Sequence, residues 1–229
     1  MNVNQIESDA KTLADASKMS WGRNMRKLSE LIMDSDKGKK VATDYFFEFW
    51  CFIKAAVQLR SVVDNSTWVL CGPRTNRSVW PLKPGDPDHF SHYQFKHASF
   101  EYRLHPGVNA TPHRFTGTYA PDISVRRTNG SGSSGRVVAM WDAKYRKNDK
   151  SPLTRPEVLT FISERELLVK RDATDNAFIS SMKKSANEAF HVCGLLTNGR
   201  FSSEDKAYLR EKSVQEVMSF GTVDQDEKP

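Results

Sequence analysis

A run of apolar side chains from Tyr45 to Leu59 predicts the central helix of the protein. All but three of its residues are apolar or aromatic, so the helix should be buried nearly all round. One of the exceptions is Glu48, and a carboxylate in such surroundings is costly unless it is paired, hydrogen-bonded or bound to a cation. The looser helical spacing of residues 6–33 predicts one or two further helices before it, separated by the polar loop 34–40.

Alternation with a period of two residues predicts strands in the middle of the chain. We expect strands at residues 100–104 and 113–119. The Gly- and Ser-rich segment 129–135 is typical of a flexible connection, so residues 123–125 and 136–145 should form the two strands of a hairpin.

The strand over residues 136–145 should lie at the centre of the sheet, because both of its faces carry apolar side chains. Alternation assigns the residues to two faces. One face holds Val138, Met140, Asp142 and Lys144, and the other holds Val137, Ala139, Trp141, Ala143 and Tyr145.

Helical patterns return after Pro152, and they predict helices at residues 157–169, 176–195 and 203–218, followed by a disordered tail at 224–229. The expected fold class is therefore α/β, with a mixed central β-sheet flanked by helices and extra N- and C-terminal helices. We divide the chain into an N-terminal helical segment (1–40), a core (41–200), and a C-terminal helix with its tail (201–229).

The composition changes this picture little, since 38% hydrophobic and 27% charged residues are ordinary for a folded protein. No apolar run approaches a bilayer span and no secretory signal is visible, so we expect a cytoplasmic protein without a membrane partner. Cys51, Cys71 and Cys193 are too few and too widely spaced for a disulfide framework or a thiolate zinc site. The net charge of +6 makes nucleic acid a plausible partner.

The most informative motif is Pro121-Asp122, then nineteen residues, then Asp142-Ala143-Lys144 at the end of the buried strand. Because side chains alternate along a strand, Asp142 and Lys144 share a face, and hairpin pairing can bring Asp122 beside them. Two converging carboxylates repel each other, so a hard divalent cation such as Mg²⁺, with Mn²⁺ as a substitute, would favour their joint ionisation. The motif predicts a metal site.

This motif resembles the PD-(D/E)xK nuclease superfamily, whose fold is the restriction-endonuclease-like core. The resemblance covers residues 44–146, and the aromatic helix with Glu48 followed by an Asp-Ala-Lys-Tyr strand is similar to bacterial restriction or defence-associated nuclease domains. It implies that Asp122, Asp142 and Glu48 hold the metal, and that Lys144 orients the nucleophile. The expected function is then metal-dependent endonucleolytic cleavage of DNA within a prokaryotic restriction or anti-phage system, with a homodimer or a partner ATPase or other defence subunit.

Several interpretations of single residues stay open. Glu48 can instead pair with Arg103 or Arg126, and Glu101 is the other candidate for the third acidic ligand. The clustered histidines His89, His92 and His97 fit no common metal template and are expected at the surface. Candidate phosphate contacts are Lys183, Lys184 and Arg146.

Two other functions remain as alternatives to the nuclease. The first is a non-catalytic nucleic-acid-binding or assembly subunit that keeps a nuclease-like fold. The second is a structural protein of a phage or mobile element. The intact acidic residues argue against the non-catalytic subunit, and titration with Mg²⁺ or Mn²⁺ separates the structural protein from the enzyme.

Overall fold

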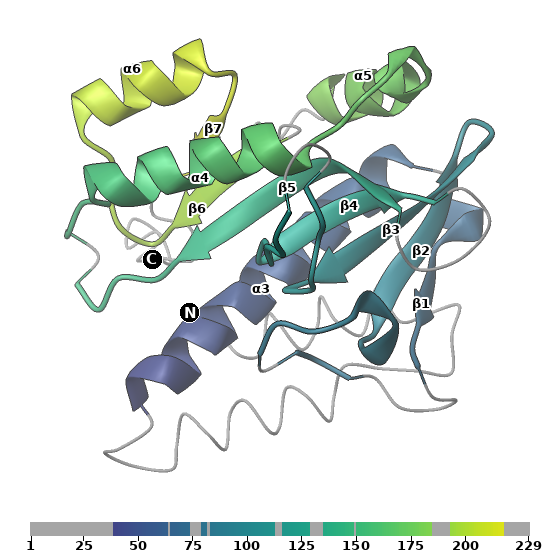
Figure 1. Ribbon diagram of the computed structural model, residues 1–229, viewed down its shortest axis with the longest axis horizontal. Helices are drawn as coiled ribbons and strands as arrows, with labels where there is room; N and C mark the ends of the chain where they lie inside the picture. Colours follow the sequence, from purple (N-terminus) through teal and green to yellow (C-terminus); the bar gives the residue numbers. More distant parts are fainter. Residues whose placement is uncertain are drawn as a thin grey trace, which may run out of the picture.

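Seven strands in the described part of the chain form one mixed sheet with helices on both faces (Figure 1). The structure is a computed structural model that describes residues 39–63, 65–73, 79–81, 83–112, 116–128, 135–148, 150–184 and 193–217. The helices expected within residues 6–33 and the tail at 224–229 lie outside these ranges.

The sheet follows the order of the chain, β1 to β7, and the first five strands form an antiparallel meander. β6 and β7 then join in parallel, so the expected mixed sheet is confirmed. The strands are β1 (Val69–Cys71), β2 (His92–His97), β3 (Phe100–Pro106), β4 (Ile123–Arg127), β5 (Arg136–Lys144), β6 (Cys193–Thr197) and β7 (Gln215–Val217).

Helices cover both faces of this sheet, which confirms the α/β architecture. The long helix α3 (Lys39–Val62) packs with α5 (Asn176–Lys184) against one face, and α4 (Arg155–Leu168) with α6 (Ser203–Glu211) covers the β5–β6 region on the other. Short 3-10 turns are η1 (Asn65–Thr67), η2 (Pro87–His89) and η3 (Ala173–Asp175). No helix among the described residues is long and apolar enough to span a membrane.

Two helix starts show why these elements form where they do. The Glu157 carboxylate accepts hydrogen bonds from the backbone N–H (2.7 Å) and the hydroxyl (2.8 Å) of Thr154, and so holds the first turn of α4. At the start of α6 the hydroxyl of Ser202 accepts a 3.0 Å bond from the N–H of Asp205. Local side chains thus satisfy backbone groups that the first turn leaves free.

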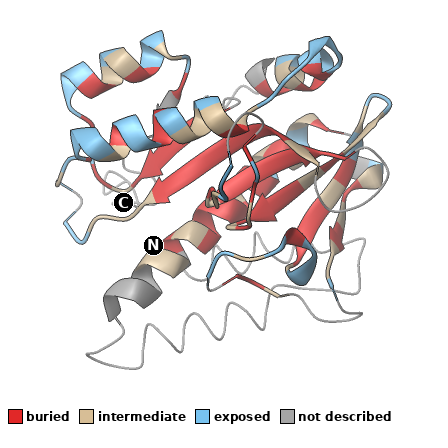
Figure 2. Cartoon of the chain, viewed as in Figure 1, coloured by how far each residue is buried: buried red, intermediate tan, exposed pale blue. Residues whose placement is uncertain are grey.

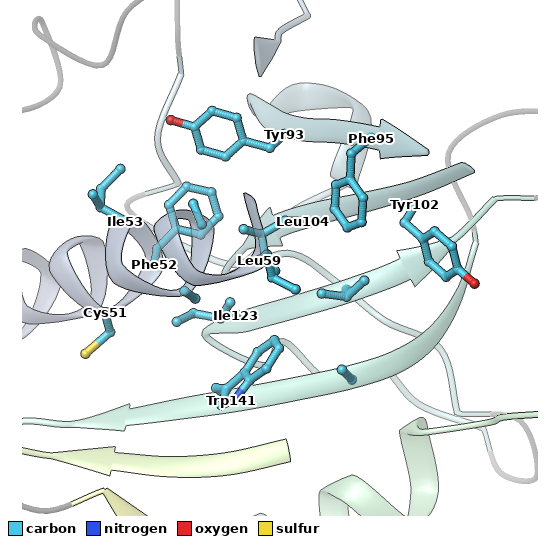
Figure 3. Packing of buried hydrophobic residues seen from close by; sticks show 14 of the residues in the cluster. Cys51, Phe52, Ile53, Leu59, Tyr93, Phe95, Tyr102, Leu104, Ile123 and Trp141 are labelled. Atoms are coloured by element: carbon cyan, nitrogen blue, oxygen red, sulfur yellow. The ribbon is translucent and has the colours of Figure 1, made fainter. Parts of the chain in front are cut away.

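The larger of the two core clusters lies between α3 and the antiparallel half of the sheet (Figures 2 and 3). Phe52 stacks on Tyr93 with ring centroids 5.8 Å apart, and Trp68 lies 5.0 Å from the same ring. Ile123 and Trp141, which flank the two candidate aspartates, are fully buried beneath α3. The core therefore fixes the strand ends that carry the acidic residues.

Three of the predicted elements are wrong in part. The helix expected over 176–195 ends at Lys184, and Cys193–Thr197 is β6, because a short apolar run cannot be told from a helix by periodicity alone. The helix expected over 203–218 ends at Glu211, and residues 215–217 form β7. No strand is seen in the described part of 113–119, where only an isolated bridge pairs Tyr119 with Ala110.

The expected alternation along β5 is broken by a bulge. Val125 pairs with Ala139 and Arg126 with Val137, so Val138 has no partner on β4. A bulge turns two successive side chains to the same side of a sheet. Accordingly Val138 packs with Ala139 in the α3-side cluster, whereas Val137 packs on the α4 side.

Candidate active site

Asp122 and Asp142 lie opposite each other at one end of the β4–β5 pair. The last register pair at this end joins Ile123 to Trp141, so the next residues on the two strands are the two aspartates. Their side chains are hydrogen-bonded to each other. The hairpin thus brings together two carboxyl groups that are separated by nineteen residues in the sequence.

Backbone and lysine contacts hold the two carboxyl groups in place. Oδ2 of Asp122 accepts a 2.7 Å hydrogen bond from the backbone N–H of Ala143. Nζ of Lys144 lies 2.6 Å from Oδ2 of Asp142, with about a third of the lysine side chain exposed. All three residues of the Asp142-Ala143-Lys144 motif therefore take part in the site.

α3 supplies Glu48 from the neighbouring face. Burial raises the pKa of Glu48 to about 7, and the negative charge of Asp142 acts in the same direction. Neither of the arginines considered as its partner binds it: Arg103 pairs with Glu101 at 3.5 Å, and Nη2 of Arg126 donates to the carbonyl oxygens of Val108 and Asn109. Glu48 is thus a member of the acidic group.

Glu101, the other candidate for the third acidic residue, lies at the far end of the sheet. Its backbone oxygen binds the N–H of Thr128 just beyond the end of β4, whereas Asp122 precedes the start of that strand. Its carboxylate accepts hydrogen bonds from Gln94 and Thr128, both at 3.0 Å. Glu101 therefore binds residues at the opposite end of β3 and β4 and is not part of the acidic group.

In the acidic group, formed by Asp122, Asp142 and Glu48, the carboxyl groups outnumber the neighbouring positive charge of Lys144. Burial raises the pKa of Asp122 well above its ordinary value, and the charges of Asp142 and Glu48 raise it further. Burial alone would lower the pKa of Lys144, but the surrounding carboxylates outweigh it and raise that pKa. A single ammonium is balanced against three acidic groups, so a further cation would be favoured there.

The donor set fits a hard cation, although its side chains are turned to one another. Carboxylate oxygens are the ligands that Mg²⁺ and Mn²⁺ prefer in proteins. Within the residues that the structure describes, no three His, Cys, Asp or Glu side chains are arranged as a ready-made metal site. Binding would require Asp122 to be ionised and Lys144 to move off Asp142.

A cleft of about 200 Å³ opens beside this group and includes Glu48 and Asp122 in its lining. Its other walls come from Tyr45 on α3, from residues 80, 81, 83 and 84 between β1 and β2, and from Gly107 and Ala120 between β3 and β4. Glu48 and Asp122 therefore face a concave surface built by three separate parts of the chain.

The residues expected to bind phosphate are not all placed for it. The guanidinium of Arg146 binds Glu157 and also donates to the carbonyl of Tyr145 at 3.3 Å, so it ties β5 to the start of α4. Lys183 and Lys184 are the last residues of α5, and their side chains lie outside the described part of the structure.

Sequence reasoning missed an acidic neighbour of the site on α4. Glu164 on α4 is half-buried; burial raises its pKa, and the charge of Asp142 adds to the shift. Its place on the inner side of α4 is the only signal of this in the sequence, because Phe161 and Leu168 mark that side as buried.

The histidine prediction is wrong for His92. His92 lies on β2 and is buried against His105 of β3, with ring centroids 4.5 Å apart. Burial lowers the pKa of His92 to about 4, and it holds the pKa of His105 well below its ordinary value. His89 is exposed as expected, and His97 lies 3.3 Å from the hydroxyl of Ser181.

Comparison with known proteins adds no relative to this picture: no family model, no curated protein and no solved structure matches the chain. The geometry of the acidic group and its cleft is therefore the basis for any statement about function.

Proposed function

We propose that the chain is a metal-dependent endonuclease that hydrolyses phosphodiester bonds of DNA, with Mg²⁺ as its cation. The observation that carries the proposal is the meeting of Asp122 and Asp142 at one end of the hairpin, with Glu48 and Lys144 against them. Buried groups with strongly perturbed pKa values and a common charge partner, beside a cleft, are typical of catalytic sites.

Each residue has a distinct role in this proposal. Asp122, Asp142 and Glu48 would hold the cation, which when bound polarises the scissile phosphate and lowers the pKa of a coordinated water. The N–H of Ala143 donates to Oδ2 of Asp122, which holds this carboxyl in place beside Asp142. Lys144 is fixed on β5 two residues beyond Asp142, where its ammonium can orient the attacking water or stabilise negative charge on the phosphate.

A non-catalytic role fits the site less well. A purely structural carboxylate pair gains stability when a cation balances each member, but here burial and mutual repulsion raise the pKa of Glu48 and Asp122. Keeping three acidic groups together in this way costs stability. A function for that arrangement explains why the cost is tolerated.

The test is cleavage of plasmid DNA, linear DNA and RNA by the purified full chain, each with Mg²⁺ and with EDTA. We expect magnesium-dependent cleavage of DNA that Asp142→Asn lowers at least about 100-fold. The matched control is Glu166→Gln, because Glu166 is an exposed carboxylate on α4. Thermal unfolding of both variants separates loss of chemistry from loss of fold.

Three results would contradict the proposal. The first is cleavage that persists in EDTA, and the second is equal activity of wild type and Asp142→Asn. The third is an Mg²⁺ titration by calorimetry that shows no difference in binding between wild type and Asp122→Asn. Cleavage of RNA but not of DNA would support metal-dependent phosphodiester hydrolysis and would show that the substrate is RNA.

A further inference from the structure

We infer that the cleft beside the acidic group holds one unstacked nucleobase, so that the substrate of this site is single-stranded or unpaired DNA. This inference rests on the proposed function, because it places the base relative to the phosphodiester that the acidic residues would cleave. It adds a substrate class, which the acidic residues by themselves do not specify.

The lining of the cleft has the chemistry that a nucleotide requires. Tyr45 and Pro84 provide flat surface, the largely buried Trp80 and Pro81 complete the wall, and the exposed Lys83 provides a cation for a phosphate. Aromatic surface combined with positive charge is the usual way to bind single-stranded nucleic acid, because every base has a π-face. Glu48 and Asp122 lie in the same lining, so a base in the cleft would lie beside two members of the acidic group.

The size of the cleft favours a single base over a base pair. Its volume of about 200 Å³ lies below the range of about 300 to 1,000 Å³ that is usual for drug-sized ligands. A base held inside a duplex cannot enter such a space without being unstacked and unpaired, which costs a few kcal/mol. Unpaired substrate avoids that cost and should therefore be preferred.

The walls of the cleft are fixed by the core and by the acidic group itself. The Trp80 ring lies edge-on to Phe49 and Phe52, with centroids 4.8 Å and 5.4 Å away. The N–H of Gly107 donates a 2.8 Å hydrogen bond to the backbone oxygen of Asp122. The cleft is thus built into the fold, and its position relative to Asp122 is set by the backbone.

Gly107 offers a way to fill the cleft without touching any charged residue. A Cβ atom at this position would meet only Cγ of Pro81, at 3.8 Å, which is an ordinary contact between two lining residues. The backbone of Gly107 is not in the left-handed region, so other residues can adopt its conformation. Gly107→Leu should therefore fold normally and occupy space that a base would use.

The first measurement uses binding and does not depend on cleavage. Single-stranded DNA that contains 2-aminopurine is titrated with Asp142→Asn protein, and its fluorescence reports stacking of the base. We expect a fluorescence change for the single strand that is absent for the same sequence in a duplex. Gly107→Leu in the same background should weaken binding about tenfold or more, which is the lower range of the loss of one stacked base. Glu166→Gln in the same background is the control.

The second measurement compares cleavage of single-stranded, duplex and abasic DNA in Mg²⁺. We expect faster cleavage of the single strand than of the duplex. Gly107→Leu should slow cleavage of the intact single strand and leave cleavage at the abasic position unchanged.

The outcomes separate this inference from the proposed function. Metal-dependent cleavage that is equal on single strand and duplex, and that Gly107→Leu does not alter, overturns the base subsite and leaves the nuclease standing. A 2-aminopurine signal that depends on Gly107, with no cleavage under any metal, supports the subsite and refutes the nuclease. A signal that is absent, or that Gly107→Leu leaves unchanged, overturns the subsite whatever the activity.

Discussion

Glu48→Gln removes one negative charge from the acidic group and keeps the shape of the side chain, so it tests the electrostatics directly. Burial, together with the charge of Asp142, raises the pKa of Glu48 from 4.5 to about 7. A carboxyl whose pKa is raised by folding supports the fold while it is protonated. That contribution is complete below the unfolded value of 4.5 and is lost as the pH rises through about 7.

The size of the effect follows from the same shift. One pKa unit corresponds to about 1.4 kcal/mol, so the change from 4.5 to about 7 is worth on the order of 3 kcal/mol. Glutamine does not titrate, and the variant escapes this loss. Without metal, we expect Glu48→Gln to be more stable than wild type by on the order of 3 kcal/mol at about pH 8, and by much less at about pH 5.

The assay is chemical denaturation in EDTA at the two pH values, with Glu166→Gln as the exposed carboxylate control. The difference between variant and wild type is the quantity to examine, because His92 and His105 have lowered pKa values and destabilise the fold as the pH falls. The reasoning is refuted if Glu48→Gln gains no stability at about pH 8, or gains the same amount at both pH values. Added Mg²⁺ should reverse the order at about pH 8, because binding to the native state stabilises wild type more.

Three further perturbations test other parts of the structure. Lys144→Met should abolish at least about 99% of cleavage yet bind Mg²⁺ as tightly as wild type or more so, because the ammonium 2.6 Å from the acidic group competes with the metal; weaker binding by calorimetry would contradict this. His105→Phe should move acid unfolding to lower pH, because burial keeps the pKa of this histidine low and stability is lost as the pH falls below its unfolded value; an unchanged acid midpoint in a circular dichroism titration would count against it. Asp175→Asn should lower the free energy of unfolding by about 3 kcal/mol, since the fully buried carboxylate binds Arg127 at 3.2 Å and Arg136 at 2.7 Å; a loss below about 1 kcal/mol in urea denaturation would contradict it.

Local patterns predicted the elements that are long or strongly periodic. The apolar run at 45–59 became the buried part of α3, and the hairpin of β4 and β5 formed around the Gly- and Ser-rich connection. The short strands β1, β6 and β7 escaped prediction because runs of three to five residues carry too little periodicity to show a strand. His92 was expected at the surface, but the sheet buries it as part of β2.

The candidate site, too, was predicted only in part from the sequence. The spacing of Asp142 and Lys144 on one strand follows from the period of two, and the structure places them 2.6 Å apart. The choice between Glu48 and Glu101 could not be made from the sequence, because both are acidic residues beside apolar ones. Strand register decided it, since Glu101 lies at the opposite end of the sheet from Asp122.

What the sequence determined by itself was therefore chemistry within one element: which residues a helix or strand carries, and which of them share a face. Only the tertiary structure decided which elements meet, because register, the bulge at Val138 and the burial of His92 depend on packing across the whole sheet. The cleft is the clearest case. Its walls come from α3, from the β1–β2 connection and from the β3–β4 connection. No local sequence pattern predicts that these three segments meet at Asp122.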